Sequence, residues 1–118
     1  MTDLRVKAYL THMRSASGLA QSYIEGMSKA SFIADTRSQQ AVIMNLVIIG
    51  EIATKLVRDH PEFTGANPQI PWASMRGMRN RIAHGYFEIN LDVVWDTVQT
   101  ALPQLQQQLT ACLTKLNA

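Results

Sequence analysis

Hydrophobic positions recur along most of this chain at intervals of three and four residues, the spacing that gathers side chains on one face of an α-helix. One such stripe, about 25 residues long, follows a cap at Thr2 or Asp3 and comprises Val6, Leu10, Met13, Ala20, Tyr23, Ile24 and Met27. A second stripe extends from about Thr36 to Arg58 and is apolar on two sides, so we expect both faces of that helix to be covered. No alternating pattern typical of a β-strand is found.

The segments next to these stripes are predicted to be connections. Residues 28–35 form a connector with room for one helical turn. The second helix is predicted to end at Asp59-His60-Pro61, because a proline disfavours helix at the residue before it. The residues that follow are typical of a loop and include Pro61, Gly65, Asn67, Pro68 and Pro71.

Two further helices are predicted in the C-terminal half. A short one opens at Pro71-Trp72, where the first turn tolerates a proline, and closes at Gly85. A long one is capped by Asn90, reaches Leu116, and is expected to kink at Pro103, which removes a helical hydrogen bond. Because the connections are short, the pattern predicts an all-α, antiparallel bundle of four helices.

The length and composition of the chain predict the number of domains and a partner. The length of 118 residues predicts one domain, residues 1–118. Only 17% of the residues are charged while 47% are hydrophobic, which indicates an apolar surface covered by a second copy of the chain, a homodimer. The lone Cys112 excludes an internal disulfide, and no cluster of metal ligands is recognisable, so no metal or cofactor is expected. Without a signal peptide or a long apolar run, the expected location is cytoplasmic.

The distribution of charge is more informative than the net charge of +2. Between Glu62 and Glu88 the sequence holds no acidic residue, but it does hold the basic side chains Arg76, Arg79, Arg81 and His84. Such a basic strip in an otherwise balanced chain indicates an anionic ligand, for example nucleic acid. A solvated helix face explains the charges equally well, so charge alone leaves both interpretations open.

A helical projection of this strip separates its polar side chains from its apolar ones. At about 100° per residue, Met75, Met78 and Ile82 fall together on the core side, and Arg81 points to solvent. The remaining polar side chains form one arc beside the core, in the order Arg79, Arg76, Asn80 and His84. Within that arc the fourth-neighbour pair Asn80 and His84 can touch, whereas Arg79 and His84 lie about 140° apart and flank a site.

This arc has the groups needed to cut RNA without a metal ion. A histidine exchanges protons near neutral pH, so His84 can act as general acid or base. RNA supplies its own nucleophile, the 2′-hydroxyl beside the scissile phosphate. Arg79 can grip that phosphate through two parallel hydrogen bonds, and Arg76 can extend the contact along the backbone. Asn80 can orient the imidazole or donate to a phosphate oxygen.

Each of these residues also has an ordinary structural explanation. A histidine at a helix end is often a partner of the helix dipole, and an arginine at a core edge often lays its stem on apolar surface. Asn80 can simply satisfy buried backbone. One histidine is also too few for separate acid and base roles, although a homodimer would bring two arcs, and thus two copies of His84, together.

A resemblance to a known family favours the catalytic interpretation. The segment Arg79-Asn80-Arg81-Ile82-Ala83-His84-Gly85-Tyr86 resembles the Arg-x4-6-His signature of the HEPN superfamily in its Arg-x4-His-x-Tyr form. The resemblance to the HepT-like branch extends from about Leu4 to Leu113. Its other elements are Asn45-Leu46-x-Ile48-Ile49-Gly50-Glu51, Ile70-Pro71-Trp72, Gly77-Met78-Arg79-Asn80, Gly85-Tyr86-Phe87 and Asp92-x-x-Trp95.

The resemblance implies a HEPN-like bundle of four to five helices that pairs as a homodimer, with both motifs lining one cleft where RNA is cut, tRNA being among the targets. It implies catalytic roles for Arg79, Asn80 and His84, with Arg76 and Arg79 on the RNA phosphates. HepT-like proteins are toxins encoded beside an antitoxin, an MNT-type nucleotidyltransferase, which transfers AMP to the motif tyrosine, matched here by Tyr86. An AMP group there would occupy the place of an RNA phosphate.

Two other functions remain open at this stage. Related helical domains are non-catalytic partners of nucleotidyltransferases, in which case Arg79 and His84 would hold a nucleotide or the partner. Independently of these functions, Tyr86 has an ordinary structural explanation as a half-buried aromatic residue below the following loop. A DNA-binding module also fits the charge, but no helix-turn-helix spacing is present.

Overall fold

The computed structural model describes residues 4–85 and 88–117, and within these ranges it contains helices and turns but no strand, which confirms the all-α prediction. Its elements, in chain order, are α1 (Leu4–Tyr23), α2 (Lys29–Ile33), α3 (Thr36–Asp59), α4 (Pro61–Ala66), α5 (Trp72–His84), α6 (Leu91–Asp96), the π-helical segment η2 (Thr97–Ala101) and α7 (Leu102–Leu116).

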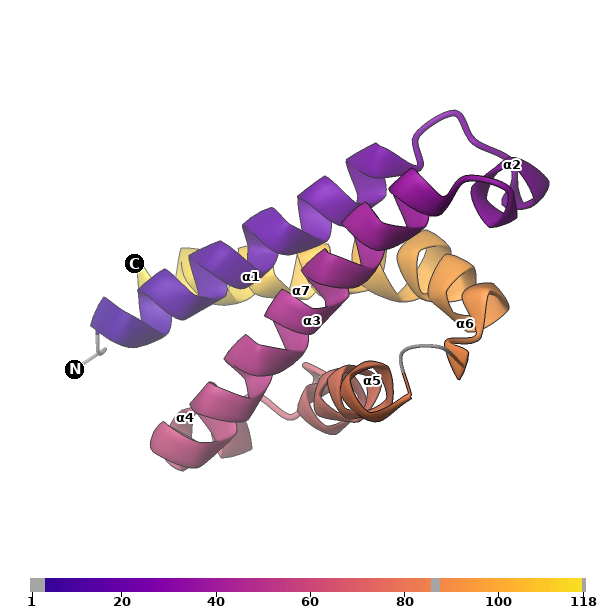
Figure 1. The fold of residues 1–118 in the computed structure, drawn as a ribbon. Helices are drawn as coiled ribbons and strands as arrows, with labels where there is room; N and C mark the ends of the chain where they lie inside the picture. Colours follow the sequence, from indigo (N-terminus) through magenta and orange to yellow (C-terminus); the bar gives the residue numbers. More distant parts are fainter. Residues whose placement is uncertain (1–3, 86–87, 118) are drawn as a thin grey trace.

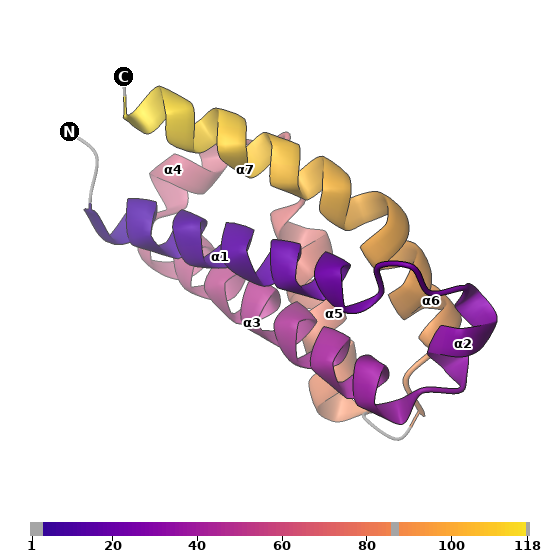
Figure 2. The same cartoon turned by 90° about the horizontal axis from the view of Figure 1, so that it is seen from above.

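The two long N-terminal helices form the centre of the arrangement. α1 and α3 run side by side in opposite directions, and α7 packs along α1 (Figures 1 and 2). α5 packs against α3 and crosses it steeply, so that Figure 1 looks down α5 while α3 lies across the page. α3 therefore has α1 on one face and α5 on another, as its doubly apolar sequence predicts.

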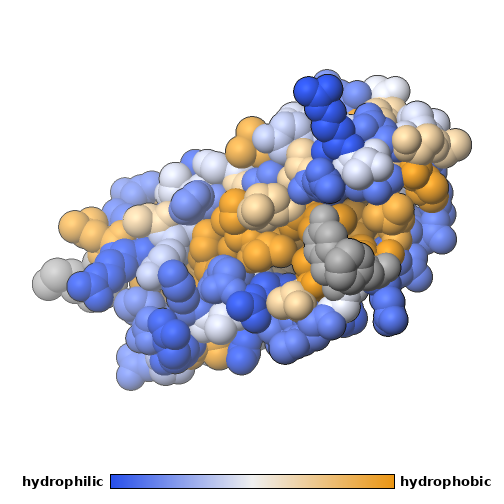
Figure 3. Space-filling model, in the orientation of Figure 1, coloured by the Kyte–Doolittle hydropathy of each residue, from blue (hydrophilic) through white to orange (hydrophobic). Residues whose placement is uncertain are grey.

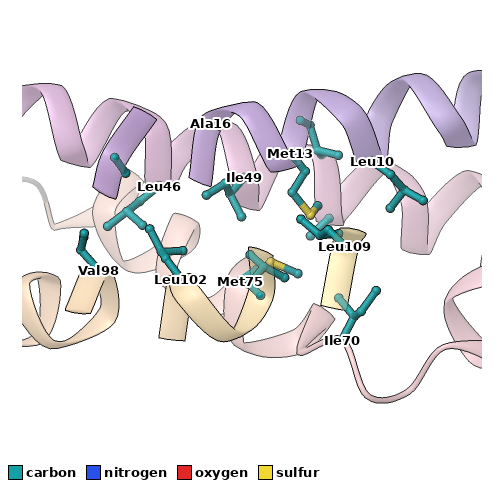
Figure 4. Close-up of a cluster of buried hydrophobic side chains, with 14 of the residues drawn as sticks. Leu10, Met13, Ala16, Leu46, Ile49, Ile70, Met75, Val98, Leu102 and Leu109 are labelled. Atoms are coloured by element: carbon teal, nitrogen blue, oxygen red, sulfur yellow. The ribbon is translucent and has the colours of Figure 1, made fainter. Parts of the chain in front are cut away.

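The core lies where these helices meet. Side chains from α1, α3, α5 and α7 point into one continuous apolar cluster (Figure 4), in which Leu10 and Leu109 are fully buried. Burying each such leucine contributes about 1.5–3 kcal/mol relative to leaving it exposed. Polar groups at the α1–α7 contact are paired, since the buried Ser17 hydroxyl donates to the Leu102 carbonyl at 3.3 Å.

Two predicted boundaries are wrong, at the end of α1 and at the start of the loop after Pro61. α1 ends at Tyr23 rather than near Met27, and Gly26 then reverses the chain with a positive φ of 79°. The helical turn expected in the connector is present as α2, which begins with a reciprocal capping box at Ser28. The predicted loop after Pro61 begins with the short helix α4, because a proline at the first helical position costs no hydrogen bond.

The predicted kink near Pro103 is confirmed, and it takes the form of a π-helical segment. The residues before Pro103 form η2, where the Leu102 amide donates to the Thr97 carbonyl five residues earlier. A proline lacks the N–H that an α-helix requires, and one wider turn absorbs the mismatch. The fourth predicted helix is consequently divided into α6, η2 and α7, and Figure 2 shows the bend between them.

α3 is the most apolar helix by length and composition. An 18-residue window within it has a mean hydropathy of 1.6, enough for a membrane-crossing segment by that criterion alone. Half of the window is buried inside the protein, where α1 and α5 cover it. A core helix of a soluble bundle passes the same test, so the hydropathy of α3 agrees with its central position.

The start of α3 gives a pH-dependent prediction. The Asp35 carboxylate accepts hydrogen bonds from the hydroxyl and the backbone amide of Ser38, at 2.9 and 3.3 Å, and these lower its pKa from the ordinary 3.8. The carboxylate therefore stabilises the fold above that ordinary pKa, and the contribution disappears as the pH falls through the lower folded-state pKa. Asp35→Asn keeps a capping oxygen but cannot titrate. Relative to this variant, we expect the wild type to lose stability between pH 7 and about pH 3, measured by urea unfolding; a constant difference would contradict the prediction.

Candidate functional site

The predicted catalytic and phosphate-binding residues lie on α5, which is anchored at its start. The Trp72 indole donates to the Asn67 carbonyl at 3.1 Å, and its ring packs edge-on against Phe63 with centroids 6.2 Å apart. Along the helix, Met75 and Ile82 are buried, which confirms the predicted core side of α5. The anchored start and the buried stripe together determine which side of α5 faces outward.

α3 and α5 approach each other unusually closely at Gly50. A Cβ built on Gly50 would lie 2.2 Å from the Arg79 Cβ and 2.7 Å from the Met75 carbonyl oxygen. Real contacts are never that short, so only glycine permits this crossing. The close approach places the first atoms of the Arg79 side chain directly on the α3 backbone.

Arg79 is held by two neighbours. Its Nε atom is fully buried and forms an ion pair with Oε1 of Glu51 on α3. Its Nη1 donates to the Asn80 side-chain carbonyl at 3.1 Å. About a third of the Arg79 side chain (34%) remains exposed, so the outer edge of the guanidinium is open to an incoming anion.

Glu51 is the site residue that charge reasoning missed. The strip between Glu62 and Glu88 contains no acid in the sequence, but the fold brings a carboxylate to Arg79 from α3. Sequence distance hides this pair, because it joins positions 28 residues apart on different helices. The available signal was that Glu51 closes the Asn45–Glu51 element of the HepT-like resemblance.

The other predicted residues occupy the outward side and the end of α5. His84 is exposed as the last residue of the helix, and Arg76 is half-buried one turn before Asn80. Asn80 is exposed and accepts its hydrogen bond from Arg79; its partner is thus the guanidinium and not the His84 imidazole. Within the described ranges no hydrogen bond joins Arg79 to His84, as the helical projection predicts. Tyr86 lies outside the described residues.

A shallow apolar groove adjoins this arc. It has a volume of about 470 Å³ and lies between α3 and α5, lined mainly by the apolar residues Ile43, Met44, Val47, Ile82 and Ala83, with Gln40 and Arg79 as its polar members. Met44 is 60% exposed there, a high value for a methionine on a central helix. Figure 3 shows the apolar band that crosses this face of the molecule. Within residues 4–85 and 88–117, no three His, Cys, Asp or Glu side chains are grouped as metal ligands would be.

Comparison with known families identifies the family of this chain. The profile described as "Ribonuclease HepT-like" matches residues 13–112, which contain α3, α5 and all of the predicted site residues. The chain therefore belongs to the HepT-like ribonuclease family, whose members have a HEPN-type helical fold.

Individual relatives cover nearly the same length. "Probable ribonuclease HepT" of Thermococcus cleftensis is 34% identical over 100 residues, which span 85% of this chain and 88% of the relative. "Putative RNase TTE0752" of Caldanaerobacter subterraneus is 29% identical over 109 residues, 92% of this chain and 95% of the relative. No solved structure matches this chain.

Proposed function

We propose that this protein is a metal-independent RNA endonuclease and that Arg79, Asn80 and His84 form the centre of its active site. The observation that carries the proposal is the arrangement around Arg79, whose guanidinium is paired with Glu51 and Asn80 yet remains one-third exposed, on the same helix that ends at the exposed His84. A fixed phosphate-binding group next to a proton-transfer group is what transesterification of RNA requires.

In the proposed reaction, His84 removes the proton from the 2′-hydroxyl as its oxygen attacks the adjacent phosphorus. Arg79 stabilises the additional negative charge on the phosphate oxygens, and Arg76 holds the neighbouring phosphate. The bond from phosphorus to the 5′-oxygen breaks, and this oxygen takes up a proton from a second imidazole. The 2′-oxygen remains bonded to phosphorus, which leaves a 2′,3′-cyclic phosphate.

The second imidazole is proposed to come from a homodimer in which both copies of α5 line one cleft. The groove beside Arg79 supports this, since it is apolar, shallow and continuous with the arc. Burial of exposed apolar side chains such as Met44 would drive the association. The site would then hold two copies of Arg79 and two of His84.

A charge placed in this groove is expected to separate the dimer. Met44→Glu would bury an unpaired carboxylate between the subunits, which is strongly unfavourable. We expect sedimentation equilibrium to show a dimer for the wild type and a monomer for the variant, with RNA cleavage lost in parallel. Leu19→Glu is the matched control, because Leu19 is 48% exposed on α1, outside the groove. A monomeric wild type at micromolar concentration would contradict the shared site.

The cellular context of the proposal rests on family membership. We propose that the nuclease is the cytoplasmic toxin of a toxin–antitoxin pair, that tRNA is among its substrates, and that an MNT-type nucleotidyltransferase silences it. Transfer of AMP to Tyr86, two residues after His84, would place a phosphodiester and a base near Arg79 and Arg76. Intact-mass measurement of the protein, alone and with the partner and ATP, tests this modification.

The direct test of the proposed activity uses purified protein, tRNA and total RNA in EDTA. Cleavage in EDTA would support a metal-independent nuclease, and phosphate binding predicts that it weakens steeply with salt. Unmodified protein, checked by mass, that binds nucleotide or RNA but never cuts would instead indicate the non-catalytic binding module.

A further inference from the structure

The contact between α3 and α5 also assigns a role to a residue outside the motif. We infer that Glu51 is a positioning residue, which fixes the Arg79 guanidinium in the orientation that receives an RNA phosphate. This inference deepens the proposed function and rests on it. It is drawn from the ion pair, the buried Nε and the neighbouring glycine, all at one helix crossing.

The first step of the argument concerns freedom of rotation. An arginine side chain has many rotamers, and ordering them at the moment of binding costs conformational entropy. Here the Cβ and Cγ of Arg79 lie against Gly50, at 2.2 and 3.0 Å from where a Gly50 Cβ would be. The base of the side chain is therefore fixed by packing before any ligand arrives.

The second step of the argument concerns the guanidinium group of Arg79. Glu51 pairs with the buried Nε, and Asn80 accepts a hydrogen bond from Nη1. Two partners on different helices determine both the position and the rotation of the guanidinium plane. The Nη2 edge carries no partner within the described residues and is available for a phosphate oxygen.

The third step separates positioning from simple stabilisation. The ion pair joins the buried Nε to a Glu51 side chain that is 41% exposed, so screening by solvent limits its contribution to folding stability. A carboxylate beside a phosphate site also opposes RNA binding through its negative charge. A residue that weakens substrate binding and adds little stability is explained by the orientation that it imposes on Arg79.

The test variant is Glu51→Gln, which keeps the shape and removes the charge. We expect kcat for tRNA cleavage to fall about tenfold or more, since small misplacements of a catalytic group are costly. We expect KM to stay the same or decrease, because a repulsive charge is lost. Glu51→Asp, which restores the charge, should recover part of kcat. Glu25→Gln is the matched control, because it removes an exposed acidic charge after α1.

A second readout does not depend on cleavage. In ¹H–¹⁵N spectra the buried Nε–H of Arg79, assigned with Arg79→Lys, should exchange slowly in the wild type and be lost or shifted in Glu51→Gln. An unchanged signal, or kcat within twofold of wild type, would overturn the inference, as would a raised KM with unchanged kcat. If wild-type protein cuts no RNA, the proposed nuclease function fails, whereas the spectrum still decides whether Glu51 fixes Arg79.

Discussion

His84→Ala is expected to lower RNA cleavage by about 10²- to 10⁴-fold, the range that general acid–base catalysis contributes. The imidazole is the proton-transfer group of the proposed site, and it lies exposed at the C-terminal end of α5. Within residues 4–85 and 88–117 the imidazole has no hydrogen-bond partner that its removal would leave unpaired, so we expect the fold to be unaffected. Initial cleavage rates with tRNA in EDTA, beside a helical circular dichroism spectrum, measure both expectations.

His12→Ala is the matched control for this variant. His12 is also exposed on a helix, α1, but it lies outside the motif and outside the groove. We expect His12→Ala to cut RNA at the wild-type rate. Equal cleavage by wild type and His84→Ala would remove His84 from the mechanism and would transfer the proposal to another proton-transfer group.

The sequence predicts those parts of the fold that depend on local patterns better than those that depend on tertiary contacts. α3 and α5 are predicted nearly to the residue, because long apolar periodicity, caps and flanking prolines all act locally. α4 was missed because its six residues hold only one buried side chain, Thr64, and leave no apolar stripe to detect. Pro103 predicts the position of the kink but not its π-helical form, because a missing N–H can be accommodated in more than one way.

The candidate site likewise contains residues that local sequence patterns predict and one that they do not. The grouping of Arg76, Arg79, Asn80 and His84 follows from helical geometry alone, since all four lie within one element. The Glu51–Arg79 pair depends on where α3 crosses α5, a tertiary contact that residue spacing does not encode. Family resemblance carried part of that information, because it placed Gly50 and Glu51 in one recurring element.

Gly50→Ala is expected to have the second largest effect, through both stability and activity. In most helix interiors this change stabilises by up to about 1 kcal/mol. Here the new methyl group would collide with the Met75 carbonyl oxygen at 2.7 Å and with the first carbon of the Arg79 side chain. Neither of these is the flexible end of a side chain, so α5 must move away from α3. Overpacking of this kind costs about 1–3 kcal/mol.

Activity should fall further than stability, because the displaced helix carries Arg79 and pulls it away from Glu51. A displacement of about 1 Å can cost about 100-fold in rate. Thermal unfolding followed by circular dichroism, with cleavage rates below the transition, separates the two effects. Gly18→Ala is the control, since its methyl group would meet only the flexible end of Gln106 at 3.4 Å and should stabilise α1. If Gly50→Ala were as stable and as active as Gly18→Ala, α3 and α5 would not need the close crossing, and the positioning of Arg79 by α3 would have to be abandoned.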